Sequence, residues 1–152
     1  MMVTHAELVA RAARWLRNTV RCGVVATEEY NVGWSIPDAI GWKSHTSYLV
    51  ECKVTRSDFF ADAKKHHRRY PDQGMGHLRY YMTPPGLVSL DEVPEHWGLL
   101  EARPKQVRVL RHGSPFSAIR IAWNERPLLI KLLKVCGNMQ GAGSESEAND
   151  AH

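Results

Sequence analysis

Two carboxylates and one amine are spaced in the sequence so that they could share one site of hydrolytic chemistry. Asp38 follows Pro37, and Glu51 and Lys53 come at the end of an apolar run, TSYLVECKV, at 46–54. Side chains alternate between the two faces of a strand, so Glu51 and Lys53 would point to the same face. If the segment containing Asp38 pairs with this strand in antiparallel fashion, the two carboxylates meet across the sheet.

Two carboxylates held close together repel each other unless a cation lies between them. Hard oxygen donors favour Mg²⁺ or Mn²⁺, and a water molecule bound to such an ion is a nucleophile near neutral pH. An ammonium group beside that water, here from Lys53, favours its hydroxide form. Two simpler interpretations stay open: Asp38 could be a turn residue after proline, and Glu51 with Lys53 could be a cross-strand ion pair.

The elements that must position these residues are a helix, three strands and a second helix. The capping box formed by Thr4 and Glu7 predicts a first helix over 5–18. Ser57 is a suitable N-cap for a second helix over 57–70. Between them, strands of a meander are expected in three β-rich segments: 19–30, 34–42 and 46–54.

The second half of the sequence predicts further strands and a closing amphipathic helix. The helix is expected over 124–137, with Gly137 as its C-cap. The strands are expected at 77–84, 96–102 and 106–112. We therefore predict an α/β fold with a mixed sheet flanked by helices, forming one domain over 1–137. The remaining segment, 138–152, is acidic and rich in glycine and serine, and is predicted to be disordered.

The order of Pro37-Asp38, then Glu51-Cys52-Lys53 at the end of an apolar strand, resembles the PD-(D/E)XK nuclease superfamily. The stretch from about 34 to 111 is also similar to the small MmcB-like DNA-repair proteins and their phage relatives. This resemblance implies a restriction-endonuclease-like αβββαβ core. It also implies a metal-dependent phosphodiester hydrolase, so we expect an enzyme of the deoxyribonuclease class.

The resemblance further implies a role for each motif residue. Asp38, Glu51 and the backbone carbonyl of Cys52 would hold the metal ion. Lys53 would orient or deprotonate the attacking water, or stabilise the charge that builds on the phosphate. The superfamily often adds an acid from the first helix, and Glu7 is the candidate here. Because Glu7 is also the N3 residue of the capping box, both roles stay open for it.

Positive charge is concentrated next to the motif. The chain has a net charge of +4, and without the three carboxylates of the tail the rest carries +7. Residues 53–79 contain seven Lys or Arg and three Asp. Asp58 and Asp62 form a like-charged pair that a basic neighbour should compensate, unless the helix dipole alone favours them. The expected contacts to the DNA backbone are Arg56, Lys64, Lys65, Arg68 and Arg69.

Together these features predict a DNA endonuclease or repair nuclease that uses Mg²⁺ or Mn²⁺. The alternative is a catalytically degenerate nuclease-fold module that binds DNA structures or a partner protein without cutting. The three cysteines include no CxxC pair, and no run approaches the roughly 18 apolar residues of a membrane span. We therefore expect a cytoplasmic protein whose partner is DNA and not a membrane. A homodimer is compatible with the sequence.

Overall fold

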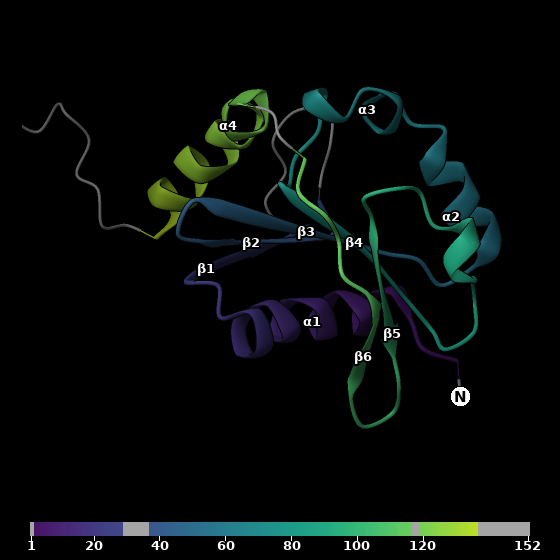
Figure 1. Ribbon diagram of the computed structural model, residues 1–152. Helices are drawn as coiled ribbons and strands as arrows, with labels where there is room; N and C mark the ends of the chain where they lie inside the picture. Colours follow the sequence, from purple (N-terminus) through teal and green to yellow (C-terminus); the bar gives the residue numbers. More distant parts are fainter. Residues whose placement is uncertain (1, 29–36, 117–118, 137–152) are drawn as a thin grey trace, which may run out of the picture.

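Six strands form one sheet within the residues that the computed structural model describes, which are 2–28, 37–116 and 119–136 (Figure 1). Strands β1, β2 and β3 form an antiparallel meander, β3, β4 and β5 run parallel, and β6 returns antiparallel to β5. The strands in sequence order are Val24–Thr27, Ala39–Lys43, Thr46–Cys52, Leu78–Thr83, Gly98–Ala102 and Val107–Arg111.

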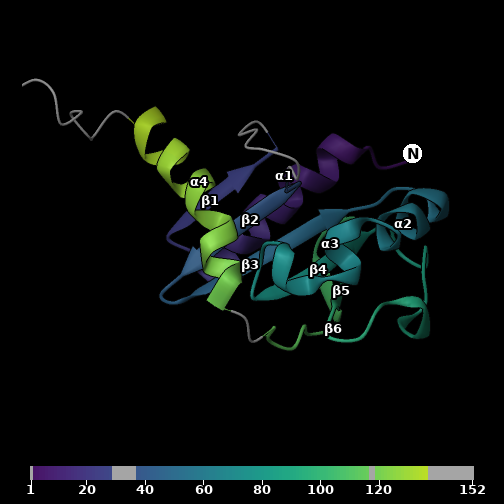
Figure 2. The same ribbon diagram turned by 90° about the horizontal axis from the view of Figure 1, so that it is seen from above.

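Helices cover both faces of this sheet (Figures 1 and 2). Helix α1, His5–Trp15, continues into a π-helical turn at Leu16–Val20 and lies across one face. The opposite face carries α2 (Arg56–Ala63), α3 (His66–Arg69) and α4 (Ile119–Val135). Short 3-10 turns lie at Pro71–Gln73 and Leu90–Glu92. The predicted α/β class, the mixed sheet and the αβββαβ order of the first elements are confirmed.

Strand β3 shows why the sheet can hold charged groups at its end. Its alternating side chains serve two separate cores: Val50 and Cys52 pack on the side of α1, whereas Leu49 packs with Phe59 of α2 on the other side. Neighbours on both edges satisfy its backbone, because β2 pairs with one edge and β4 with the other. A charged residue at the end of such a strand is therefore buried among apolar layers and needs a partner of opposite charge.

The boundaries of two helices differ from the prediction. The second helix uses Thr55 and not Ser57 as its N-cap, because the Thr55 hydroxyl accepts a hydrogen bond from the Asp58 amide. This helix ends at Ala63, and 66–69 form the separate helix α3, so 57–70 is not one continuous helix. Helix α4 starts five residues earlier than predicted and includes Pro127.

Helix α4 is attached to the sheet by one buried carboxylate. Glu125 is 2% exposed, and its two oxygens accept three hydrogen bonds from separate parts of the chain. The donors are the Ser47 hydroxyl at 2.6 Å, the Gly76 amide at 2.7 Å and the Trp42 indole at 3.1 Å. A buried carboxylate with this many donors is satisfied, and it fixes the helix against both β2–β3 and the loop before β4.

Two predictions for the end of the chain concern residues that the structure does not describe. The expected C-cap Gly137 and the acidic tail at 138–152 both fall there. Within the described ranges, no helix combines the length and the apolar character needed to cross a membrane.

Candidate active site

A pocket of about 310 Å³ opens where β2 begins and β3 ends, between α1 and α2. The motif residues Asp38, Glu51 and Lys53 all line it, so the structure brings together the three side chains predicted to form one site. Its remaining lining residues are His5, Cys52, Asp58, Ala61, Asp62 and Lys65.

Asp38 lies at the edge of the β2–β3 pairing and is not only a turn residue. It directly precedes β2, and the pairing of Ala39 with Val50 places it beside Glu51 on the neighbouring strand. Its Oδ2 accepts a buried hydrogen bond of 2.7 Å from the Cys52 amide. This bond orients the carboxylate toward the end of β3 and leaves lone pairs on both oxygens for further ligands.

Glu51 is buried, with 4% of its surface exposed. Its Oε1 lies 3.1 Å from Nη2 of Arg68, and its Oε2 lies 4.0 Å from Nζ of Lys53. Burial raises the pKa of Glu51 to about 8 despite the neighbouring guanidinium of Arg68. The carboxylates of Asp38 and Asp62 raise this pKa further. The simple alternative of an exposed ion pair between Glu51 and Lys53 therefore does not describe this residue.

Asp62 of α2 is the centre of a buried charge network. Its carboxylate lies 3.3 Å from Nζ of Lys53, 3.1 Å from Nζ of Lys65 and 2.8 Å from Nε of Arg68. It also accepts a hydrogen bond from the Tyr81 hydroxyl. Although burial raises the pKa of Asp62, Arg68 and these other partners hold it below the ordinary range of a carboxyl group. The predicted compensation of Asp62 by a basic neighbour is thus present: Arg68 and Lys53, the residue directly after β3, both reach its carboxylate.

The position of Arg68 does not fit its predicted role as a contact to the DNA backbone. Its side chain is 5% exposed and lies between Glu51 and Asp62. The guanidinium also lies over the Trp97 ring, 4.7 Å from its centroid, and that ring stacks on Tyr81. Burial lowers the pKa of Arg68, but the two carboxylates outweigh burial and raise it above its ordinary value. A cation enclosed in this way supports the site from inside and is not available to a DNA phosphate.

The other predicted DNA contacts lie on the surface. Arg56 is half exposed, but its guanidinium pairs with Glu92 at 2.8 Å and lies over the Phe60 ring. Lys65 is 51% exposed while its ammonium reaches Asp62. Lys64 and Arg69 are exposed around the junction of α2 and α3, and Lys64 directly precedes the pocket-lining Lys65 in the chain. The structure is therefore compatible with a phosphate-binding surface at this junction, made of fewer cations than the sequence suggests.

Glu7 does not reach the pocket. Its carboxylate accepts a hydrogen bond of 2.8 Å from the Thr4 amide, and its own amide donates to the Thr4 hydroxyl, so the predicted capping box is present. His5, in the first turn of the same helix, lines the pocket instead.

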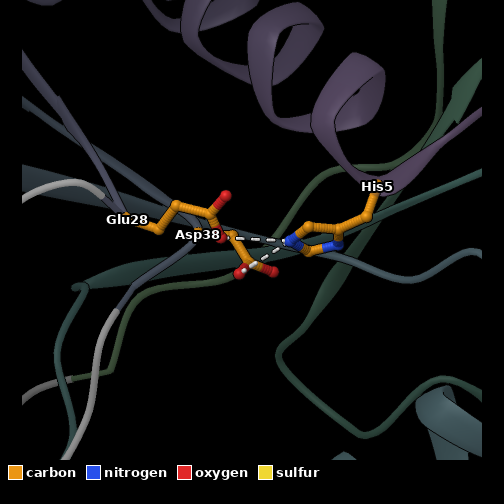
Figure 3. Close-up of side chains that lie close together, drawn as sticks. All are labelled: His5, Glu28 and Asp38. Carbon is orange, nitrogen blue, oxygen red and sulfur yellow. Dashed lines mark hydrogen bonds and ion pairs between the residues drawn. The ribbon is translucent and has the colours of Figure 1, made fainter.

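The sequence did not predict two residues near the pocket, His5 and Glu28. The Nε2 atom of His5 lies 3.1 Å from Oε2 of Glu28 and 3.5 Å from Oδ1 of Asp38 (Figure 3). Glu28 directly follows β1, so an acid at the end of a predicted strand was the signal available for it. No comparable signal marks His5, because a histidine in a first helical turn is common.

No protein-family model matches the chain, and no curated protein matches its sequence. A solved structure is similar in fold: the SPO1766 protein of unknown function from Silicibacter pomeroyi superposes with a TM-score of 0.65 and 21% sequence identity. The match covers 90% of this chain and 89% of that chain. At this level of identity the likeness shows a shared fold alone.

Proposed function

We propose that this protein is a divalent-metal-dependent nuclease of the PD-(D/E)XK type that hydrolyses phosphodiester bonds in DNA. The observation that carries the proposal is the pocket in which Asp38, Glu51 and Lys53 meet. Two carboxylates from neighbouring strands and a lysine two residues after the second of them form the combination that the motif predicts.

The donor atoms of the pocket suit Mg²⁺ or Mn²⁺. Asp38 and Glu51 provide hard oxygen donors, and the raised pKa of Glu51, about 8, shows that burial among other carboxylates disfavours its ionised form. A divalent cation would compensate this charge, and Cys52, whose carbonyl is the third expected ligand, also lines the pocket. When bound, such an ion supplies an activated water and neutralises charge on the phosphate.

Lys53 is held close to where the reaction would take place. Its side chain is 11% exposed, and Asp62 fixes its ammonium group at 3.3 Å. A cation placed in a largely buried pocket stabilises developing negative charge more than it would in water. Lys53 therefore serves to orient the attacking water or to stabilise the phosphate in the transition state, and Asp62 and Arg68 act as positioning residues.

The proposal is tested by incubating the protein with supercoiled, linear, single-stranded and branched DNA in Mg²⁺ or Mn²⁺. Cleavage of at least one substrate that EDTA abolishes is the expected result. Absence of cleavage of every substrate, with DNA and metal both bound, would instead favour a nuclease-fold module that recognises DNA without cutting it.

Replacing Glu51 by Gln is expected to raise the melting temperature of the protein in EDTA at about pH 8.5. The folded-state pKa of Glu51, about 8, lies above its ordinary 4.5, so its contribution to stability is present below about pH 4.5 and is lost as pH rises through 8. Gln avoids this loss, and the two proteins should converge toward pH 5. Scanning calorimetry across this pH range measures the difference.

The same variant should lose its response to Mg²⁺. For a dissociation constant of about 1 mM, 10 mM Mg²⁺ would stabilise the wild type by roughly 1.4 kcal/mol, or about 3–6 °C. Asp91→Asn, an exposed change in the turn at Leu90–Glu92, is the control and should keep the full shift. A normal Mg²⁺ response in Glu51→Gln would exclude Glu51 as a ligand.

Replacing Lys64 or Arg69 by Ala is expected to weaken DNA binding equally for different sequences. Both residues are exposed at the junction of α2 and α3. A lysine or arginine that contacts phosphate releases counterions on binding. The slope of log K against log salt should become less steep by up to about 0.9 for each lost contact. Fluorescence anisotropy in EDTA at several salt concentrations measures this slope. Unchanged slopes in both variants would place the DNA elsewhere.

A further inference from the structure

Helix α4 carries apolar residues on two opposite sides. It lies at the other end of the sheet face from α2 (Figures 1 and 2). On its inner side, Leu128 and Leu132 are buried in one of the two cores. Its opposite side presents four residues at intervals of three, four and three, which we call the outer seam: Trp123, Arg126, Ile130 and Leu133. Trp123 is 63% exposed, and Ile130 and Leu133 are about half exposed.

The spacing of the outer seam is that of a helix which packs against a second helix. Intervals of three and four residues alternate along the a and d positions of a coiled coil, so these residues lie on one stripe. Single apolar residues are ordinary at a protein surface, but a contiguous apolar stripe marks an interaction site. Tryptophan and arginine are also the residue types that most often dominate the binding energy of protein interfaces. The seam extends for about 15 Å along the helix axis.

The charge on the exposed surface of α4 is entirely positive. The exposed charged residues of this helix are Arg120, Arg126 and Lys134, and its one carboxylate, Glu125, is buried. Arg126 lies within the seam, and its guanidinium is 5.5 Å from the centroid of the Trp123 ring. A partner that covers the seam removes water from this cation. Such a partner must therefore place a carboxylate opposite Arg126.

Three other occupants fit this surface less well. A second copy of the chain would bring two sets of these cations together, with no exposed carboxylate on either α4. DNA phosphates would pair with the cations but offer no apolar surface to Ile130 and Leu133. In a helix that lies on an anionic membrane, the cations are on the polar face, whereas Arg126 lies inside the apolar stripe.

We infer that the outer seam of α4 binds an amphipathic helix of a partner protein. Apolar side chains of the partner cover the seam, and an Asp or Glu of the partner pairs with Arg126. This is recognition of a helix through anchors at i, i+3 and i+7. The inference does not depend on the proposed nuclease function, because the seam shares no residue with the pocket. A contact of this length is small, so the complex belongs to the weak, reversible class.

The test uses a fluorescent helical peptide of about three heptads, with Leu at the a and d positions and Glu at e and g. The like charges of its glutamates keep this acidic peptide from pairing with itself. A basic peptide with Lys in place of every Glu is the comparison. Anisotropy with the full-length protein should show binding of the acidic peptide and at least about tenfold weaker binding of the basic peptide.

Replacing Arg126 by Glu should reverse this preference, so that the basic peptide binds more tightly than the acidic one. Trp123→Ala and Ile130→Ser should each weaken binding of the acidic peptide by about tenfold or more. These three side chains are exposed, so the variants should melt at the wild-type temperature. Arg108→Glu on β6 and Leu90→Ser are the matched controls, because they make the same kinds of change at exposed positions outside α4. Both should keep the wild-type affinity.

Absence of binding, equal binding of the two peptides by the wild type, or an unchanged preference in Arg126→Glu would overturn the inference. A wild-type dimer in analytical ultracentrifugation that Ile130→Ser dissociates would overturn it in favour of a second copy. A loss of affinity for DNA or for phosphatidylserine vesicles in Trp123→Ala, without peptide binding, would overturn it in favour of a polyanionic surface. DNA cleavage in Mg²⁺ tests the proposed nuclease function separately from all of these outcomes.

Discussion

Replacing Lys53 by Met is expected to reduce DNA cleavage by about a hundredfold to ten-thousandfold. Met keeps most of the aliphatic volume of the lysine stem and removes the ammonium group, which Asp62 holds at 3.3 Å within the pocket. Under the proposed function this group acts on charge that develops in the transition state, so its loss should lower kcat much more than DNA affinity. Single-turnover cleavage in Mg²⁺ and anisotropy in EDTA measure the two quantities separately.

Lys105→Met is the control for this prediction. Lys105 is exposed between β5 and β6 and does not line the pocket. Its cleavage rate should equal that of the wild type. If Lys53→Met cuts DNA at the wild-type rate, Lys53 has no part in the mechanism. If its cleavage falls only in proportion to a loss of DNA affinity, Lys53 serves ground-state binding.

Replacing Asp62 by Asn is expected to lower the free energy of unfolding by about 3–5 kcal/mol. The Asp62 side chain has no exposed surface and faces the charged groups of Lys53 and Arg68, whose side chains are only 11% and 5% exposed. Neutralising it leaves these two cations, both largely out of contact with water, without the carboxylate closest to them. Urea unfolding at pH 7 measures the loss, which corresponds to a fall in melting temperature of roughly 10 °C or more.

The pH dependence of this loss follows from the charge state of Asp62. Burial raises its pKa, but Arg68 and its other partners hold that pKa below the ordinary 3.8. The stabilisation is therefore present above about pH 4 and is lost as pH falls through the folded-state value, so the difference between the two proteins should shrink in acid. Asp58→Asn, an exposed change on the same helix, should alter stability by less than about 1 kcal/mol. An equal effect of the two substitutions would contradict the network.

Much of the sheet was predictable because its central strands carry simple signals. Alternation in β3 correctly separates Val50 and Cys52, which pack in one core, from Leu49, which packs in the other. The break between α2 and α3 was not predictable, because no proline or glycine interrupts 57–70. Arg68 of α3 contacts both Glu51 and Asp62. These contacts belong to the tertiary structure, and local sequence patterns do not predict them.

Some residues of the candidate site were predictable from the sequence, and others were not. The order and spacing of Asp38, Glu51 and Lys53 predict that they share one site, and all three line the pocket. In the sequence, Arg68 looks like any other surface arginine of a basic segment. Its side chain, however, is only 5% exposed in the structure. His5, in the first turn of α1, lines the pocket. Amphipathic periodicity predicts which face of α1 packs on the sheet, but it does not specify which residues of the helix lie near the pocket.

The attachment of α4 through Glu125 has a consequence for how the protein opens. Detaching this helix breaks the hydrogen bonds of Glu125 to Ser47, Gly76 and Trp42 at once. The three donor groups are then left without their acceptor, and apolar contacts cannot replace it. We therefore expect the middle of α4, the β2–β3 hairpin and the loop before β4 to open together as one cooperative unit in hydrogen exchange. The last turns of α4, where Leu133 and Val135 are more than half exposed, lie beyond this attachment, and we expect their amides to exchange faster than those of the rest of the helix.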